Sequence, residues 1–341
     1  MPKSQIAFLA TVFFIAGVAL ASRFIIPGFV IQVFSFFLAA CIALGFLKRR
    51  FMIAAIFLFA LSLGVVRATE EPYEFSFLDP INGALGGVQE VFVANINRTL
   101  PEPHAAYLSG LLVGARTTIP YEIKEAFRAT GTSHIIALSG YNVTIIAENI
   151  KALSGSMAVS AVGIVLFVLM TGASSSVVRA AIMGILVLVA KHYGRDYNAR
   201  NSLIVAVGLM IFINPTILFG DVGFQLSVLA TAGLIYGVPY TNRVVYWLPK
   251  KLGIREAAAS TLAAQVATLP LVLYYFGRFS PLAPIVNILV LVTIPATMLT
   301  GFLVGMTGFI SGALAQLFAW PTYLLLAYQL SVIQFFASLN F

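Results

Sequence analysis

The sequence predicts an all-α, polytopic integral membrane protein, and three observations lead to that fold class. Hydrophobic residues make up 60% of the 341 residues and charged residues only 9%, whereas soluble domains carry about 25% charged residues. Apolar runs recur between short basic loops, and at roughly 20 residues a span the chain has room for about ten transmembrane helices. Proline and glycine interrupt the apolar runs of the last third, which predicts broken or re-entrant helices.

Residues 1–67 are predicted to form an N-terminal three-span membrane segment. Its apolar runs cover residues 5–21, 25–47 and 51–66. The basic triplet Lys48-Arg49-Arg50 lies between the second and third runs, and such residues collect in cytoplasmic loops. Ala19-Leu20-Ala21 resembles a signal-peptidase site, so the sequence leaves open whether the first 21 residues are cleaved.

Residues 68–104 are predicted to form a short external segment. Between Thr69 and Pro103 the chain carries acidic residues throughout and a single basic residue, Arg98. This scarcity of Lys and Arg is typical of the outer side of a membrane. About 35 residues suffice for a strand pair or short helices rather than for a substantial domain.

Residues 105–341 are predicted to form a second membrane domain. Its apolar runs cover residues 134–150, 157–171, 177–190, 203–213 and 224–238. Its basic loops lie around residues 191–200 and 243–255, and every basic loop of the chain then falls on one side. Beyond residue 280 two interpretations stay open: kinked helices with a Gly301–Gly305 contact face, or broken helices that line an aqueous cavity. The side on which the C-terminus lies also stays open.

The densest set of polar residues beside membrane-type sequence lies between Ile119 and Asn142. Pro120 and Gly131 are typical first-turn and C-terminal residues of one amphipathic interfacial helix, and Arg128 is a candidate for the external mouth of a path. The following run enters the membrane with polar or small residues, which are costly there unless they face a partner or water. These residues are His134, Ser139, Gly140, Tyr141 and Asn142.

The sequence does not favour an enzyme or a metal site. On one helix, His134 and Ser139 would point roughly 140° apart, so they could not form a nucleophile and base pair. Three scattered histidines and the lone Cys41 give no metal-ligand spacing, and no phosphate-binding loop occurs. We therefore expect no catalytic residue, cofactor or metal. The function class that remains is the passage of a substrate across the membrane.

Two polar positions allow both a functional and a packing interpretation. Ser139 and Asn142 share a helix face that would suit a pore wall or hydrogen bonds between helices. Arg179 lies in the first turns of a predicted span, where it could contact a substrate phosphate or extend to the membrane surface. Asp221, Phe224 and Gln225 begin a later span at its outer end.

Three stretches taken together resemble the core motifs of the ComEC competence family, the inner-membrane channel of natural transformation. They are LLVGARTTIPYEIKEAFRATGTSHIIALSGYNVTII, SSSVVRAAIMGILVLVAKHYGR and NPTILFGDVGFQLSVLATAGL. The resemblance covers roughly residues 107–240 and identifies residues 105–341 as a competence-type channel domain. Asn142 stands where the family commonly has a second histidine. The external OB-type domain and the nuclease domain of many members are not expected here.

The resemblance implies a multi-pass channel that carries single-stranded DNA across the inner membrane. Its path would include His134, Ser139, Gly140, Tyr141, Asn142, Arg179, Asp221, Phe224 and Gln225. Partners would be the DNA, the lipid bilayer and separate chains that act as nuclease, external DNA receptor and cytoplasmic ATPase or helicase. The alternative is a secondary transporter or lipid-linked precursor carrier, because broken helices and polar midplane groups serve those folds too.

Overall fold

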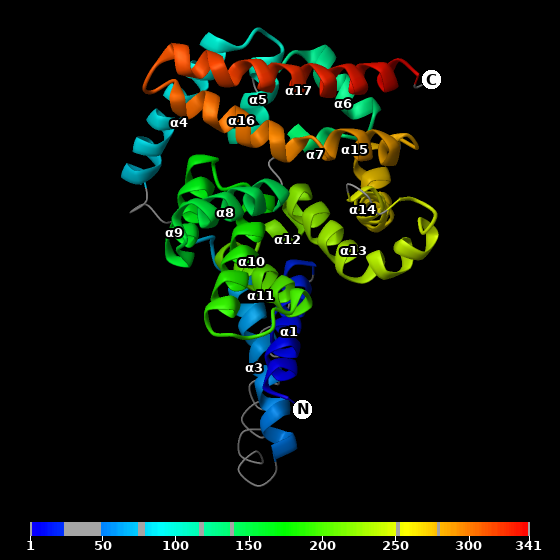
Figure 1. Ribbon diagram of the computed structural model, residues 1–341. Helices are drawn as coiled ribbons and strands as arrows, with labels where there is room; N and C mark the ends of the chain where they lie inside the picture. Colours follow the sequence, from blue (N-terminus) through cyan, green and yellow to red (C-terminus); the bar gives the residue numbers. More distant parts are fainter. Residues whose placement is uncertain are drawn as a thin grey trace. The chain divides into compact units, whose positions relative to one another are not determined.

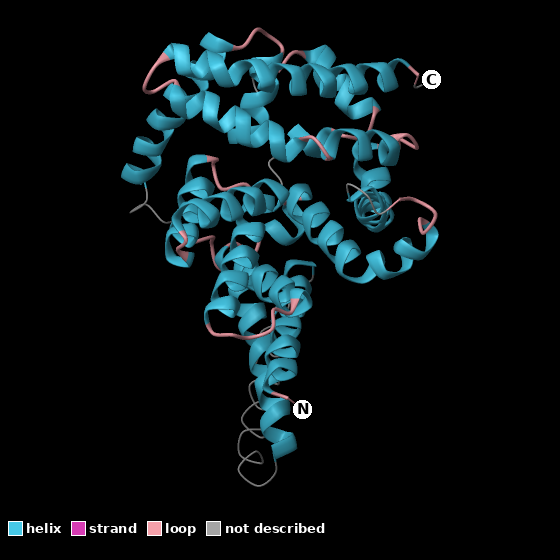
Figure 2. Ribbon diagram, viewed as in Figure 1, coloured by secondary structure: helices cyan, strands magenta, loops and turns pink. Residues whose placement is uncertain are grey.

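The computed structural model describes residues 2–23, 49–73, 79–115, 119–136, 140–249, 253–277 and 280–339. Every regular element within these ranges is a helix, which confirms the all-α class (Figures 1 and 2). The predicted second span, residues 25–47, lies outside the described residues. The chain divides into two compact units, which are described separately. Unit 1 comprises Met1–Ser76 and Val189–Val228, and unit 2 comprises Phe77–Leu188 and Leu229–Phe341.

Five helices in the described part of the chain are long and apolar enough to cross a membrane. They are α1 (Lys3–Arg23), α3 (Arg49–Ala68), α10 (Ser175–His192), α13 (Val222–Val244) and α14 (Ile254–Phe276). The pair α15 (Ala283–Leu291) and α16 (Ile294–Thr307) meets at 49° and would raise the number to six. The predicted count of about ten is not confirmed, because two predicted spans form shorter helices, α9 (Met157–Met170) and α11 (Ala199–Ile213).

In unit 1, α1 and α3 run side by side in the same direction. The rings of Phe13 and Phe57 stack at 5.0 Å, and four residues further on Gly17 lies against the backbone of Leu61. Gly64 lies in the same way against the backbone of Phe14, so each helix uses a glycine where the other approaches. Paired small residues of this kind allow close packing of membrane helices.

Helix α11 runs parallel to α1 in the same unit. The guanidinium of Arg200, at the start of α11, lies 4.9 Å from the ring centre of Phe8. Near the other end of the helix, Phe212 lies beside Phe14, with ring centres 6.2 Å apart. The common direction of α1, α3 and α11 is the one that the distribution of basic loops predicts.

Unit 2 is organised around a short buried helix, α5 (His104–Val113). All residues from Ala105 to Val113 are buried. Ten residues extend about 15 Å, too little to cross a bilayer. The other helices of the unit are α4 (Asp79–Thr99), α6 (Tyr121–Ala129), α7 (Ser133–Ile136), α8 (Gly140–Ser154) and α17 (Gly312–Ser338), with α9, α14, α15, α16 and parts of α10 and α13.

The region predicted as a short external segment forms one long helix, α4, instead of a strand pair or several short helices. Phe92 of α4 packs onto Gly305 of α16, and Asn95 packs onto Gly308, the C-cap residue of that helix. The side-chain nitrogen of Asn95 donates to the Gly305 carbonyl at 3.2 Å. The glycines of α16 therefore form a helix contact face, as one of the two interpretations of this region predicts. Apolar positions spaced three and four apart in α4 explain why it is a helix.

The amphipathic helix is present, and the described residues of the segment after it are helical. Helix α6 buries Ile123 and Phe127, and Pro120 is its N-cap residue rather than its first helical residue. Within the predicted run of residues 134–150, the described residues form α7, up to Ile136, and α8, from Gly140; the three residues between them lie outside the described ranges. Ser139 lies outside the described residues, so the expectation that His134 and Ser139 lie on one helix stays a prediction.

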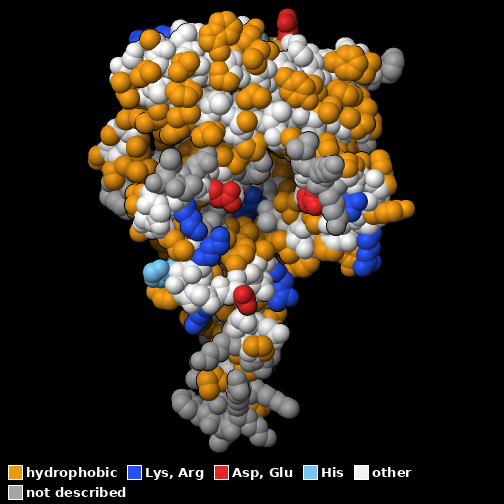
Figure 3. All heavy atoms as spheres, in the orientation of Figure 1, with side chains coloured by type: hydrophobic (Ala, Val, Ile, Leu, Met, Phe, Trp, Pro, Cys, Tyr) orange, Lys and Arg blue, Asp and Glu red, His pale blue; other side chains and the backbone are white. Residues whose placement is uncertain are grey.

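Large apolar side chains are exposed on the helices of both units. Figure 3 shows hydrophobic side chains over much of the visible surface. On α17, for example, Leu317, Trp320 and Leu324 are each 65% exposed. An apolar outer surface of this extent matches a protein whose solvent is lipid.

Candidate functional site

The first turn of α8 connects to the buried helix α5 through Asn142. This residue is 2% exposed, and its side-chain nitrogen donates to the main-chain carbonyl of Leu111 at 2.9 Å. Leu111 lies in the last turn of α5, where carbonyls lack a partner within the helix. Gln89 of α4 donates to the Val113 carbonyl at 3.1 Å in the same turn. Of the two interpretations of Asn142, the hydrogen bond between helices is the one that the geometry displays.

Arg179 is buried within unit 2 and does not extend to the surface. Its side chain is 7% exposed, and its guanidinium donates to the hydroxyl of Thr231 on α13. The interpretation that Arg179 extends to the membrane surface is therefore wrong. A guanidinium that is removed from water is costly unless it is paired or hydrogen-bonded, so this buried position requires compensating contacts.

Gly140 explains how the guanidinium of Arg179 fits. A Cβ atom at position 140 would lie 3.1 Å from the Cβ of Ala180 and 3.5 Å from Nη2 of Arg179. The lack of a side chain thus lets the start of α8 lie directly against the first turns of α10. Gly140, Arg179 and Thr231, drawn from α8, α10 and α13, form one cluster, here called the buried cationic cluster after its buried arginine; Gly140 and Thr231 are half-buried. Two of these three residues were predicted from the sequence, and Thr231 was not.

The other predicted residues of unit 2 lie elsewhere. His134 is exposed on the four-residue helix α7. Arg128 is exposed on α6 and forms an ion pair of 3.3 Å with Glu125, one turn earlier. Ser139 and the side chain of Tyr141 lie outside the described residues.

Asp221, Phe224 and Gln225 belong to unit 1, and each has a local structural role there. The Asp221 carboxylate accepts a hydrogen bond of 2.9 Å from the main-chain nitrogen of Phe224, which is how an N-cap residue satisfies a free donor of a helix start. Gln225 donates to the Leu218 carbonyl at 3.0 Å and fastens the short helix α12 (Ile217–Gly220) to α13. The ring of Phe224 is buried.

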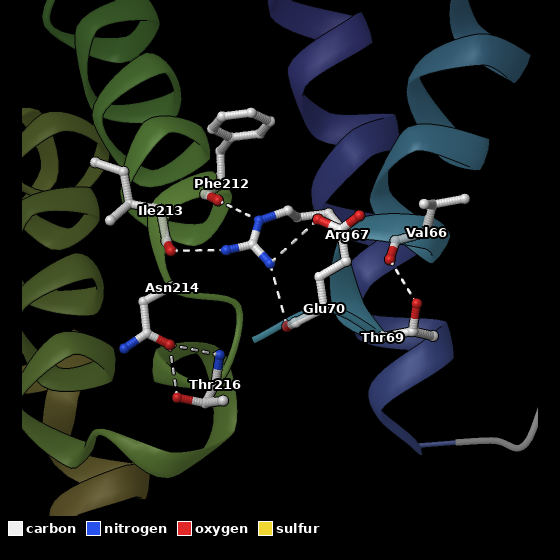
Figure 4. Close-up of polar contacts among 8 residues, drawn as sticks. All are labelled: Val66, Arg67, Thr69, Glu70, Phe212, Ile213, Asn214 and Thr216. Carbon is white, nitrogen blue, oxygen red and sulfur yellow. Dashed lines mark hydrogen bonds and ion pairs between the residues drawn. The ribbon is translucent and has the colours of Figure 1, made fainter. Parts of the chain in front are cut away.

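Arg67 in unit 1 is a buried cation that the sequence reasoning missed. Its guanidinium caps the C-terminal end of α11, where it donates to the carbonyls of Phe212 at 2.6 Å and Ile213 at 2.8 Å (Figure 4). It also donates to the Glu70 carbonyl at 3.2 Å and lies 4.3 Å from the ring centre of Tyr73. A favourable field for a cation exists at a helix C-terminus. The available signal was an arginine at the end of an apolar run, directly before a segment rich in acidic residues.

The described residues contain no group of three or more His, Cys, Asp or Glu side chains that could hold a metal ion. The chemistry that the described clusters offer is a buried positive charge and side-chain amides.

Comparison with known proteins identifies relatives over the same region. The family model described as "Competence protein" matches residues 111–341. The "ComE operon protein 3" of Bacillus subtilis is 26% identical over 201 residues, which cover 57% of this chain and 25% of that protein. An "Uncharacterized protein YcaI" of Escherichia coli is 40% identical over 57 residues, 16% of this chain and 8% of that protein. No solved structure matches.

The aligned parts span at most a quarter of the length of these relatives. The family match itself covers more than half of the present chain and includes the three sequence stretches that resemble competence motifs. It also includes α8, α10 and α13, which carry the buried cationic cluster.

Proposed function

Because the chain belongs to the Competence protein family, we propose that it translocates single-stranded DNA across the bacterial inner membrane during natural transformation. The observation that carries the proposal is the family match over residues 111–341. A role in competence DNA uptake follows from the family and from the similarity to the ComE operon protein 3. The proposal adds that this chain supplies the membrane path for the DNA.

The buried cationic cluster supports a path for a polyanion. Each nucleotide of single-stranded DNA carries one phosphate charge, so its passage through an apolar layer requires positive or hydrogen-bonding contacts. Arg179 holds such a charge inside the helical part of unit 2, and Gly140 leaves its guanidinium close to a backbone without a side chain. We propose Arg179 as a phosphate contact, with Thr231 as the residue that orients it.

The remaining predicted residues take lesser roles in this proposal. Asn142 maintains the contact of α8 with α5, Asp221 and Gln225 maintain the start of α13, and Arg128 marks the external mouth. His134 is exposed and available for contact with DNA. We assign degradation of the second strand, capture of external DNA and energy supply to partner chains: a nuclease, a DNA receptor and an ATPase or helicase.

Deletion and complementation test the function. In a naturally transformable strain, deletion of the gene should reduce transformation by at least a thousandfold, and expression of the wild-type chain should restore it. Electroporation of the same DNA is the matched control, because it bypasses natural uptake but still requires recombination. A deletion strain that transforms naturally at the wild-type frequency would contradict the proposal. Equal losses by both routes would place the defect after uptake and would contradict it as well.

A further inference from the structure

The break between α15 and α16 has a local cause in the sequence. Pro295 lies in the first turn of α16 and has no N–H group. In a continuous helix its ring would clash with the carbonyl of Leu291, four residues earlier. The two helices therefore meet at 49°, and carbonyls at the end of α15 require partners from outside that helix.

Two successive residues of α17 bond to this break. The hydroxyl of Tyr328 donates to the Leu289 carbonyl at 3.4 Å. The side-chain nitrogen of Gln329 donates to the hydroxyls of Thr293 at 2.8 Å and Thr297 at 2.7 Å. Thr293 is the N-cap residue of α16, and Thr297 lies one turn further along it. Helix α17 is thus hydrogen-bonded to the break itself.

The directions of these hydrogen bonds fix the orientation of the Gln329 amide. The Thr293 hydroxyl donates to the Val290 carbonyl at 2.8 Å, and the Thr297 hydroxyl donates to the Thr293 carbonyl at 2.9 Å. A hydroxyl has one proton to donate, so both threonines must accept from Gln329. The nitrogen of the amide therefore faces the threonines and its oxygen faces the opposite way.

Tyr107 of α5 bonds to that oxygen. Its hydroxyl donates to Oε1 of Gln329 at 2.9 Å, and the side chains of both residues are fully buried. The amide of Gln329 thereby uses both N–H groups and its oxygen. Tyr107, Thr293, Thr297 and Gln329, here called the Gln329 network, join α5, α16 and α17.

We propose that the Gln329 network is a lock that holds the α15–α16 pair in its bent conformation. Within an apolar layer, freed backbone groups have no water to bond, so they depend on partners within the protein. Loss of the network removes the polar attachment of α16 to α17. The α15–α16 pair then no longer keeps its bent conformation. A buried network of this kind specifies one arrangement of the helices because each member satisfies another. The proposal concerns conformation and does not depend on which substrate crosses the membrane.

Hydrogen exchange tests the lock directly. The full-length protein is placed in lipid nanodiscs, and amide exchange is followed by mass spectrometry in peptides that cover residues 289–297. Gln329→Leu keeps a similar volume and removes all three amide contacts, so exchange in these peptides should become at least tenfold faster. Tyr107→Phe removes one contact and should have a smaller effect, and it should add nothing in the Gln329→Leu background.

The matched control is Thr322→Val on the same helix. Thr322 is fully buried two turns before Gln329, and its hydroxyl donates within α17 to the Phe318 carbonyl at 2.7 Å. This variant should leave exchange at residues 289–297 unchanged. An equal increase in the Thr322→Val variant, or no increase in a folded Gln329→Leu protein, would overturn the lock. If Gln329→Leu does not fold, Thr297→Val, which removes one acceptor, is judged by the same two criteria.

Discussion

Asn142 donates a hydrogen bond of 2.9 Å from its side chain to the main-chain carbonyl of Leu111. This contact joins the first turn of α8 to the last turn of α5, and both residues are buried. Asn142 thus supplies a hydrogen-bond donor to a carbonyl in the last turn of α5, where the helix itself offers no N–H group. The fold of unit 2 depends on several such amide contacts around α5.

The Asn142–Leu111 contact predicts a stability effect. Asn142→Leu leaves the Leu111 carbonyl buried without its donor, which should lower the free energy of unfolding by about 1–2 kcal/mol. Thermal unfolding in detergent measures the loss. Thr144→Val is the control, because Thr144 is exposed on the same helix and its hydroxyl donates to the Gly140 carbonyl within that helix. Equal midpoints for wild type and Asn142→Leu would contradict this role.

Arg67 predicts a second stability effect, confined to unit 1. Arg67→Met removes the donors to the Phe212 and Ile213 carbonyls and should cost about 2–3 kcal/mol, because hydrogen bonds that involve a charged group are stronger than neutral ones. The measurement is the unfolding midpoint in detergent. Arg195→Met, at an exposed loop position of the same unit, should leave the midpoint unchanged. Similar midpoints for the two variants would argue against the cap.

The close contact of α1 with α3 at Gly17 predicts a loss of stability when a side chain is added there. A Cβ atom there would overlap the carbonyl oxygen of Leu61, so Gly17→Ala forces α1 and α3 apart and should cost about 1–3 kcal/mol. Gly83→Ala on α4 is the matched control, since no atom lies within 4 Å of a Cβ at that position. That change should be neutral or stabilising by up to about 1 kcal/mol. A stable Gly17→Ala variant would show that α1 and α3 do not cross at these glycines.

Two substitutions distinguish the contribution of the Arg179 charge to transformation from that of its hydrogen bond to Thr231. Arg179→Gln can still donate to Thr231 but lacks the positive charge, so transformation should fall at least tenfold at unchanged protein level. Thr231→Val keeps the charge and should reduce transformation less. Immunoblots of membrane fractions control for expression. Wild-type transformation by Arg179→Gln would remove Arg179 from the proposed DNA path.

Local sequence patterns predicted much of the fold. Apolar runs gave the positions of α1, α3, α10 and α13, and the basic loops predicted the common direction of α1, α3 and α11. The length of α4 was not predicted, since the burial of its apolar positions depends on packing against α16.

The polar contacts were harder to predict than the helices. Arg179 and Gly140 were expected at the site, but their proximity depends on how α8 packs against α10. In the sequence, Arg67 looks like any arginine at the end of a span. Its role as a cap depends on the position of α11, which the sequence does not show. Gln329 is a single amide in an apolar helix, and its partners lie more than 30 residues away in the sequence. Such contacts depend on tertiary packing, which the sequence pattern alone does not specify.

The fate of labelled DNA tests the central claim most directly. Double-stranded DNA with a distinct label on each strand is supplied to the deletion strain and to the same strain complemented with this chain. Cells are treated with external nuclease, and labelled single strands are then recovered from the cytoplasm. The proposal predicts protected, single-stranded, cytoplasmic label in the complemented strain and at least a thousandfold less in the deletion strain. Equal cytoplasmic label in both strains would contradict the claim that this chain supplies the path.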